Sequence, residues 1–81
     1  IYVEVYRSVL KHGIDVADAV QAATRYLVAV DLTEGNPARQ LRWGFDTKGQ
    51  LLETVVLTFD DRSQLIIHAM KARKTYLDLL P

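Results

Sequence analysis

Two short polar loops divide the second half of this 81-residue chain into three segments with strand-like patterns of apolar residues, the first of them alternating between apolar and polar. The loops are Asp46-Thr-Lys-Gly49 and Asp60-Asp-Arg-Ser63, and the segments cover residues 39–46, 51–59 and 65–70. Aspartate, glycine and serine favour tight turns, and glycine can adopt the positive φ that such turns need. Connections this short join antiparallel neighbours, because a parallel connection needs a crossover of a dozen or more residues. The pattern therefore predicts an antiparallel meander.

The N-terminal stretch fits two patterns. Apolar residues at positions 1, 3 and 5 alternate as in a strand, whereas those at 2, 5, 6, 9 and 10 recur at helical spacing. A helix over residues 2–12 is favoured, because Gly13 follows Lys11 and His12 in the arrangement of a C-cap preceded by cations. In this interpretation His12 has a structural role at the helix end.

A second, short helix is expected after Asp15, which stands at an N-cap position with Asp18 completing a capping box. Its buried side would consist of Val16, Ala19, Val20 and Ala23. After Thr24 the pattern becomes extended. Residues 26–30 are rich in β-branched and aromatic side chains, which predicts a first strand, and residues 33–37 form a cluster typical of turns.

The last ten residues predict a closing helix over 71–80, with an apolar stripe of Tyr76, Leu77 and Leu80. The expected fold is thus a single α+β domain spanning residues 1–81. It contains two N-terminal helices, a four-stranded, mainly antiparallel sheet and a C-terminal helix. Helices on one face of such a sheet leave the other face partly open, where a protein of this plan can bind a partner.

Composition excludes several classes of site. With no cysteine the chain forms neither disulfides nor a thiolate metal site, and its two histidines, His12 and His68, stand far apart in the sequence. No uncharged apolar run approaches the length of a membrane span. The net charge is zero, yet residues 1–61 carry a net charge of −3 and residues 62–81 a net charge of +3. A neutral chain is no general polyanion binder, but its basic end could hold phosphate.

The basic end contains the most informative cluster of residues. Strand alternation places His68 near the end of a strand, on one face with Ile66 and Met70, and Lys71, Arg73 and Lys74 follow. Such a cluster suits RNA cleavage, because a group that titrates near neutrality can move protons while cations stabilise the phosphorane. The structural alternative is a histidine whose hydrogen bonds are made within the sheet, followed by a helix whose first turn happens to be basic. Asp60 and Asp61 are interpreted as a solvated turn.

Three short strings of the chain carry a resemblance to a known family. Lys11-His12-Gly13-Ile14, followed by Asp18-Ala19, resembles the segment K-H-G-[VI]-x-x-x-[ED]-A. Gly49-Gln-Leu-Leu52, leading into Val55-Val56, resembles the hairpin G-R-L-L-x-V-V, and residues 67–72 stand in the place of I-S-A-R-x-A. These segments are typical of the BrnT-type toxins of bacterial type II toxin–antitoxin systems, which the chain therefore resembles; the family consists of small ribonucleases with a RelE-like fold.

The chain also departs from the family pattern. His68 replaces the family serine and Met70 replaces an arginine to which the resemblance assigns a functional role. The last segment holds fewer basic residues than is usual, and the family is basic overall whereas this chain is neutral. Either the site is rearranged around His68, or the chain is a divergent member with weak or no nuclease activity.

Two functions follow from these observations. The first is a metal-independent, cofactor-free endoribonuclease toxin of the cytoplasm, with an RNA substrate and a cognate antitoxin as partners. His68, Lys71 and Arg73 would be its catalytic residues, with Arg42, Lys74 and Tyr76 as RNA-binding residues; Arg42 would help if its strand face coincides with that of His68. The second is a non-catalytic interaction module that binds an antitoxin or a peptide. The apolar content of 49% favours assembly in either case, as a homo-oligomer or with the antitoxin.

Overall fold

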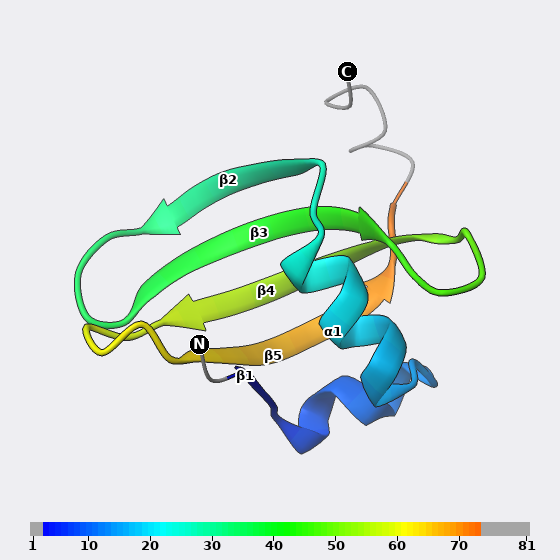
Figure 1. Ribbon diagram of the computed structural model, residues 1–81, viewed down its shortest axis with the longest axis horizontal. Coiled ribbons are helices and arrows are strands. Elements are labelled where there is room, and N and C mark those ends of the chain that lie inside the picture. Colours follow the sequence, from blue (N-terminus) through cyan, green and yellow to red (C-terminus); the bar gives the residue numbers. More distant parts are fainter. Residues whose placement is uncertain (1–2, 74–81) are drawn as a thin grey trace.

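A five-stranded mixed sheet carries one α-helix across one of its faces (Figure 1). The structure is a computed structural model, and it describes residues 3–73. The strand order is β1-β5-β4-β3-β2, in which β1 runs parallel to β5 and all other neighbours are antiparallel. The elements in chain order are β1 (Val3–Val5), the 3-10 helix η1 (Arg7–His12), α1 (Val16–Thr24), β2 (Val28–Thr33), β3 (Ala38–Phe45), β4 (Leu51–Thr58) and β5 (Gln64–Lys71).

The expected plan of two N-terminal helices, a four-stranded sheet and a closing helix is wrong. The N-terminal stretch contains both of its competing patterns in succession, because Val3–Val5 forms a strand and Arg7–His12 forms a short 3-10 helix. β1 pairs in parallel with β5, with Val3 opposite Gln64 and Val5 opposite Ile66, and so adds a fifth strand. Three alternating residues are too short a signal to predict a strand whose partner lies at the far end of the chain.

The meander is present, and the change of pattern at Thr24 coincides with the end of α1. β2, β3 and β4 follow one another as antiparallel neighbours, and β4 pairs in the same way with β5. The loop between β3 and β4 closes through two backbone amides, those of Lys48 and Gln50, which both donate to the Asp46 carboxylate at 2.8 Å. Local turn chemistry thus determines these connections, as the sequence pattern predicted.

The predicted end of the first helical segment at Gly13 and the predicted start of the second helix after Asp15 are both found, but the predicted capping box is not. Gly13 ends η1 with a φ of 73°, and its N–H donates to the Leu10 carbonyl oxygen at 3.2 Å. Asp15 is the N-cap residue of α1 but makes no side-chain capping bond. The Asp18 carboxylate instead accepts hydrogen bonds from the backbone N–H and the hydroxyl of Thr47, and so joins α1 to the β3–β4 loop.

Small side chains let α1 lie close to the sheet. Its buried positions include Ala19, Ala22 and Ala23, and it packs chiefly against β3 and β4. Gly44 on β3 lies directly under Ala22, since a Cβ built at Gly44 would stand 2.2 Å from the Ala22 carbonyl oxygen. The core between helix and sheet is formed by Val9, Ala19, Ala23, Val56, Ile66 and Ala69.

An irregularity in β5 changes which residues share a face. Val56 pairs with Ile66 and Val55 pairs with His68, so Ile67 is an extra residue in the ladder. Ile66 and Ala69 therefore both belong to the core under α1, although strict alternation would place them on opposite faces. The expectation that Ile66, His68 and Met70 share one face is wrong, because the bulge separates Ile66 from the other two.

The closing helix expected over residues 71–80 does not begin at Lys71, which is the last residue of β5. The chain continues alongside β4 instead, because the Ala72 N–H donates to the Leu51 carbonyl oxygen at 3.0 Å. Lys74, Tyr76 and the rest of the predicted apolar stripe lie outside the described residues. Within residues 3–73 no helix has the length and apolar character needed to cross a membrane.

Candidate functional site

The two histidines of the chain lie in contact with each other. His12 ends η1 and His68 lies in the second half of β5, and their ring centroids are 5.4 Å apart with an angle of 74° between the planes. β1 pairs only with the first three residues of β5, and η1 packs against β5 as well. The Ser8 hydroxyl of η1 donates to the carbonyl oxygen of Ile67, the next residue of β5, at 2.8 Å. This packing, and the Gly13 cap that ends η1, bring His12 beside His68.

An ion pair between a buried carboxylate and a half-exposed guanidinium lies near His68. Glu53, the third residue of β4, is 1% exposed and pairs in register with Met70. Its carboxylate accepts two hydrogen bonds from the Arg73 guanidinium, from Nε at 3.0 Å and from Nη2 at 3.1 Å, and one from the Arg73 backbone N–H at 3.1 Å. About half of the Arg73 side chain is exposed (53%), so the cation reaches the surface while its partner does not.

The electrostatic environment favours the neutral form of His68. Partial burial lowers the pKa of His68 below its ordinary value, because desolvation penalises the imidazolium. The Glu53 carboxylate opposes this by raising the pKa of His68, while the nearby His12 and Arg73 lower it further. A neutral imidazole at neutral pH is a proton acceptor, which suits the role of a general base.

The structure brings together some of the predicted site residues and separates others. His68 and Arg73 lie in one electrostatic neighbourhood, and the exposed Lys71 lies at the end of the same strand. Arg42 belongs to the other face of the sheet. It stands opposite Thr54, and its guanidinium donates to the Ala23 carbonyl oxygen at the end of α1. The strand faces of Arg42 and His68 therefore do not coincide, and Arg42 does not join this site. Lys74 and Tyr76 lie outside the described residues.

The site also contains two residues that the sequence interpretation missed. The sequence pattern predicts a structural role for His12 at a helix end, and it places Glu53 within the strand expected over residues 51–59. A signal for Glu53 does exist, because it is a lone carboxylate in the middle of an apolar strand, which requires a partner if the strand is buried. Its partner, Arg73, could not be named from spacing alone.

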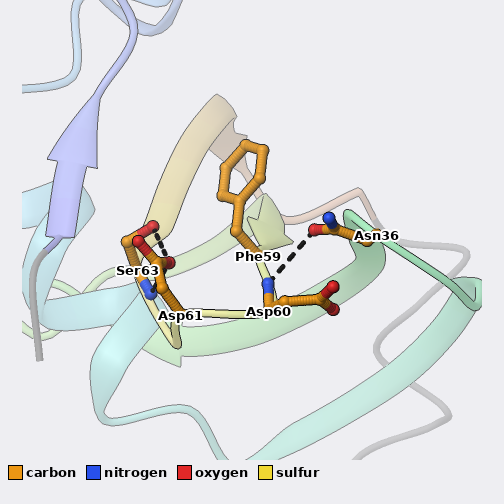
Figure 2. A pocket seen from close by; sticks show the side chains of 5 residues that line it. All are labelled: Asn36, Phe59, Asp60, Asp61 and Ser63. Carbon is orange, nitrogen blue, oxygen red and sulfur yellow. Dashed lines mark hydrogen bonds between the residues drawn. The ribbon is translucent and has the colours of Figure 1, made fainter.

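A separate hollow of about 420 Å³ lies at the end of the sheet where β4 turns into β5 (Figure 2). Asn36, Phe59, Asp60, Asp61 and Ser63 line it. The Asp60 N–H donates to the Asn36 side-chain oxygen, and the Asp61 carboxylate accepts from the N–H and hydroxyl of Ser63. The hydrogen bonds from Ser63 lower the pKa of Asp61. Bonds of this kind are typical of a tight turn, which agrees with the interpretation of Asp60 and Asp61 as a solvated turn.

Among residues 3–73, no group of three or more histidine, aspartate and glutamate side chains is arranged to hold a metal ion. The candidate site consists of two imidazoles, the buried Glu53 carboxylate and the Arg73 cation. Lys71 does not join it, because Lys71 pairs with Leu52, opposite Gly44, on the face of the sheet that α1 covers. No protein-family model, curated protein or solved structure matches the chain.

Proposed function

We propose that this chain is a metal-independent endoribonuclease that cleaves RNA with a pair of histidines. The observation that carries the proposal is the contact between His12 and His68, whose rings are 5.4 Å apart although the residues are far apart in the sequence. Two adjacent imidazoles can supply both a proton acceptor and a proton donor near neutral pH, which is the requirement for phosphodiester cleavage by an internal hydroxyl.

In the proposed reaction His68 acts as the base. Its Nδ1 or Nε2 accepts the proton of the RNA 2′-hydroxyl, and the 2′-oxygen forms a bond to the adjacent phosphorus. The bond between phosphorus and the 5′-oxygen breaks, and the leaving oxygen takes a proton from the His12 imidazolium. The products are a 2′,3′-cyclic phosphate and a free 5′-hydroxyl. Each histidine ends in the other protonation state, and water restores both.

One cation supports this reaction. The half-exposed guanidinium of Arg73 follows β5 and lies close enough to His68 to lower its pKa, whereas Lys71 belongs to the face of the sheet that α1 covers. Positive charge close to the scissile phosphate stabilises the charge that develops on its oxygens. Glu53 fixes the orientation of Arg73 through two side-chain hydrogen bonds, so we assign Glu53 as a positioning residue.

The biological setting that we propose is the cytoplasm of a bacterium, with a cognate antitoxin as the partner that restrains the nuclease. The local strings around Lys11-His12-Gly13, Gly49 and Ala69 support this setting by their resemblance to BrnT-type toxins. The overall arrangement of helices and strands is not an argument for it. A small-molecule or protein cofactor has no part in the proposal.

The test is cleavage of a fluorescently end-labelled RNA by the purified chain in the presence of a chelator. We expect His68→Gln and His12→Gln each to lower the cleavage rate by about 10²-fold or more, the usual contribution of a general acid or base. Arg73→Gln should weaken RNA binding, and more so at low salt, because it removes a phosphate contact. The 2′,3′-cyclic end is detected by mass spectrometry.

Arg25→Gln is the matched control, since it removes an exposed charge at the end of α1, away from the histidines. It should keep full activity, and thermal unfolding of each variant separates lost chemistry from lost folding. Full activity in a folded His68→Gln variant, or products with a 3′-hydroxyl, would overturn the mechanism. A chain that cleaves no RNA would overturn the nuclease proposal and favour the interaction module.

A further inference from the structure

Arg42 on β3 is a buried cation with three hydrogen bonds and an aromatic contact. It is 6% exposed, its Nε donates to the Gln40 side-chain oxygen at 3.0 Å, and its Nη1 donates to the Ala23 carbonyl oxygen at 3.0 Å. Nη1 also donates to the Gln64 side-chain oxygen at 3.3 Å, and the guanidinium carbon lies 4.6 Å from the centre of the Tyr26 ring. These contacts fix the position of the guanidinium.

All three hydrogen-bond acceptors of Arg42 are neutral. Within residues 3–73 no carboxylate lies within ion-pair distance of its guanidinium, and its Nη2 has no hydrogen-bond partner. The nearest link to a carboxylate is indirect, since Gln40 donates through its other amide atom to Asp31 at 2.7 Å. Burial lowers the pKa of Arg42, although arginine remains charged in proteins. A buried charge without a counter-ion is costly, so an anion at this position would be stabilised.

A pocket of about 380 Å³ opens beside this cation. Its lining consists of Val3 from β1, Thr24 at the end of α1, Tyr26, Arg42 and Gln64. Among these lining residues only Arg42 is charged, while Val3 and the ring of Tyr26 offer apolar walls. Small-molecule sites have this composition: mostly apolar surfaces with one or two polar groups in fixed positions.

We propose that this pocket binds a small organic carboxylate, with the carboxylate at the guanidinium of Arg42 and its apolar part against Val3 and Tyr26. The planar guanidinium matches a carboxylate in geometry, and one positive charge neutralises one negative charge. A phosphate monoester carries about two charges near neutral pH and would need further cations, which the described lining does not contain. The pocket lies on the face of α1, so it is independent of the histidine site.

The test uses benzoate, its neutral analogue benzamide and inorganic phosphate as probes of the ¹⁵N-labelled chain. The side-chain and backbone ¹⁵N–H signals of Arg42 and the backbone ¹⁵N–H signal of Tyr26 are followed during each titration. We expect benzoate to produce saturable shifts in the millimolar range, and benzamide to bind about tenfold or more weakly, because it lacks the charge that pairs with Arg42. Inorganic phosphate should bind more weakly than benzoate.

Arg42→Met is the central variant, since methionine replaces the guanidinium by an unbranched apolar side chain. Its affinity for benzoate should be about tenfold or more lower than that of the parent chain. Arg39→Met, on the same strand but on the opposite face, should keep the affinity of the parent chain. Equal binding of benzoate and benzamide, preferred binding of phosphate, or benzoate binding that survives in Arg42→Met would overturn the proposal. The comparison of benzoate with benzamide needs no variant, so it decides the matter even if Arg42→Met does not fold.

Discussion

Glu53 shows how one buried side chain determines the position of residues far along the chain. Glu53 is the third residue of β4, and its carboxylate receives three hydrogen bonds from Arg73, of which one comes from the backbone. Because a buried carboxylate is stabilised only if its oxygens are paired, the chain after β5 is held against β4 at this point. The same carboxylate faces His68 and raises its pKa against the effect of burial.

The lowered pKa of His68 predicts a pH dependence of folding. In the unfolded chain His68 has its ordinary pKa of about 6.5, whereas in the folded chain the pKa is lower. Between these two values the unfolded state binds more protons, so the free energy of unfolding decreases as the pH falls below about 6.5. Above that pH the group makes no difference to stability. Urea unfolding between pH 7.5 and pH 5 measures the effect.

The His68→Gln variant isolates this contribution, because glutamine does not titrate. We expect its stability to fall less than that of the parent chain as the pH is lowered through this range. Carboxylates that lose their charge at lower pH, such as Asp18 and Asp61, are common to both proteins and cancel in the difference. Parallel curves for the two proteins would show that His68 titrates normally in the fold.

At the scale of elements, the approach of α1 to the sheet depends on Gly44. A Cβ at this position would stand 2.2 Å from the Ala22 carbonyl oxygen and 3.0 Å from its carbonyl carbon. Gly44→Ala should therefore push the helix away from β3 and destabilise the fold by about 1–3 kcal/mol, the usual range for overpacking. The change is measured as a shift in the midpoint of chemical unfolding.

The neighbouring side chain provides a control for this prediction. The atoms that the new methyl group would meet belong to the Ala22 backbone, so removing the Ala22 methyl group does not relieve the clash. The double variant Gly44→Ala/Ala22→Gly should be no more stable than Gly44→Ala. A rescue by Ala22→Gly, or a stable Gly44→Ala protein, would contradict the close contact of helix and sheet.

The elements that could be predicted from sequence are those determined by neighbouring residues. The loops at residues 46–49 and 60–63, the cap at Gly13 and the end of α1 at Thr24 all depend on local chemistry. β1 and the bulge at Ile67 depend instead on distant partners, namely β5 for the strand and the Ser8 hydroxyl for the bulge carbonyl. No local pattern contains that information.

The candidate site divides in the same way. His68 and Arg73 lie within a few residues of each other, so their proximity could be read from the sequence. The placement of Lys71 on the opposite face depends on the β4–β5 register, which the sequence does not show. The approach of His12 requires η1 to pack along β5, and the pairing of Glu53 with Arg73 requires the β4–β5 register. Arg42 and His68 lie on opposite faces of the sheet. Which face each side chain occupies depends on the strand register and on the bulge in β5, and neither can be obtained from the sequence.

At the scale of the whole molecule, the sheet has a weaker side at β2. This strand lies at the edge, and its residues after Ala29 are exposed, whereas β4 lies between two long neighbours, with half of its residues buried and none exposed. Hydrogen-bonded amides of β2 should therefore exchange with solvent at least about tenfold faster than those of β4, because local opening of an edge strand exposes little core. Amide exchange followed by NMR measures both strands in one experiment.

A uniform exchange rate across β2, β3 and β4 would contradict this expectation and indicate that the sheet opens only as a unit. The comparison is internal to one sample, so it requires no variant. The result also bears on assembly, because the easily opened edge is the one that a further strand would extend.

The parallel pairing of β1 with β5 has a mechanical consequence. Both strands run in the same direction, and Val3 begins the first while Lys71 ends the other. A load applied between these two residues acts along the strands and slides one past the other, so the bonds that bridge them are stretched together. An antiparallel pair at the same place would be opened like a zipper, one bond after another. The short first strand thus resists traction along the chain out of proportion to its length.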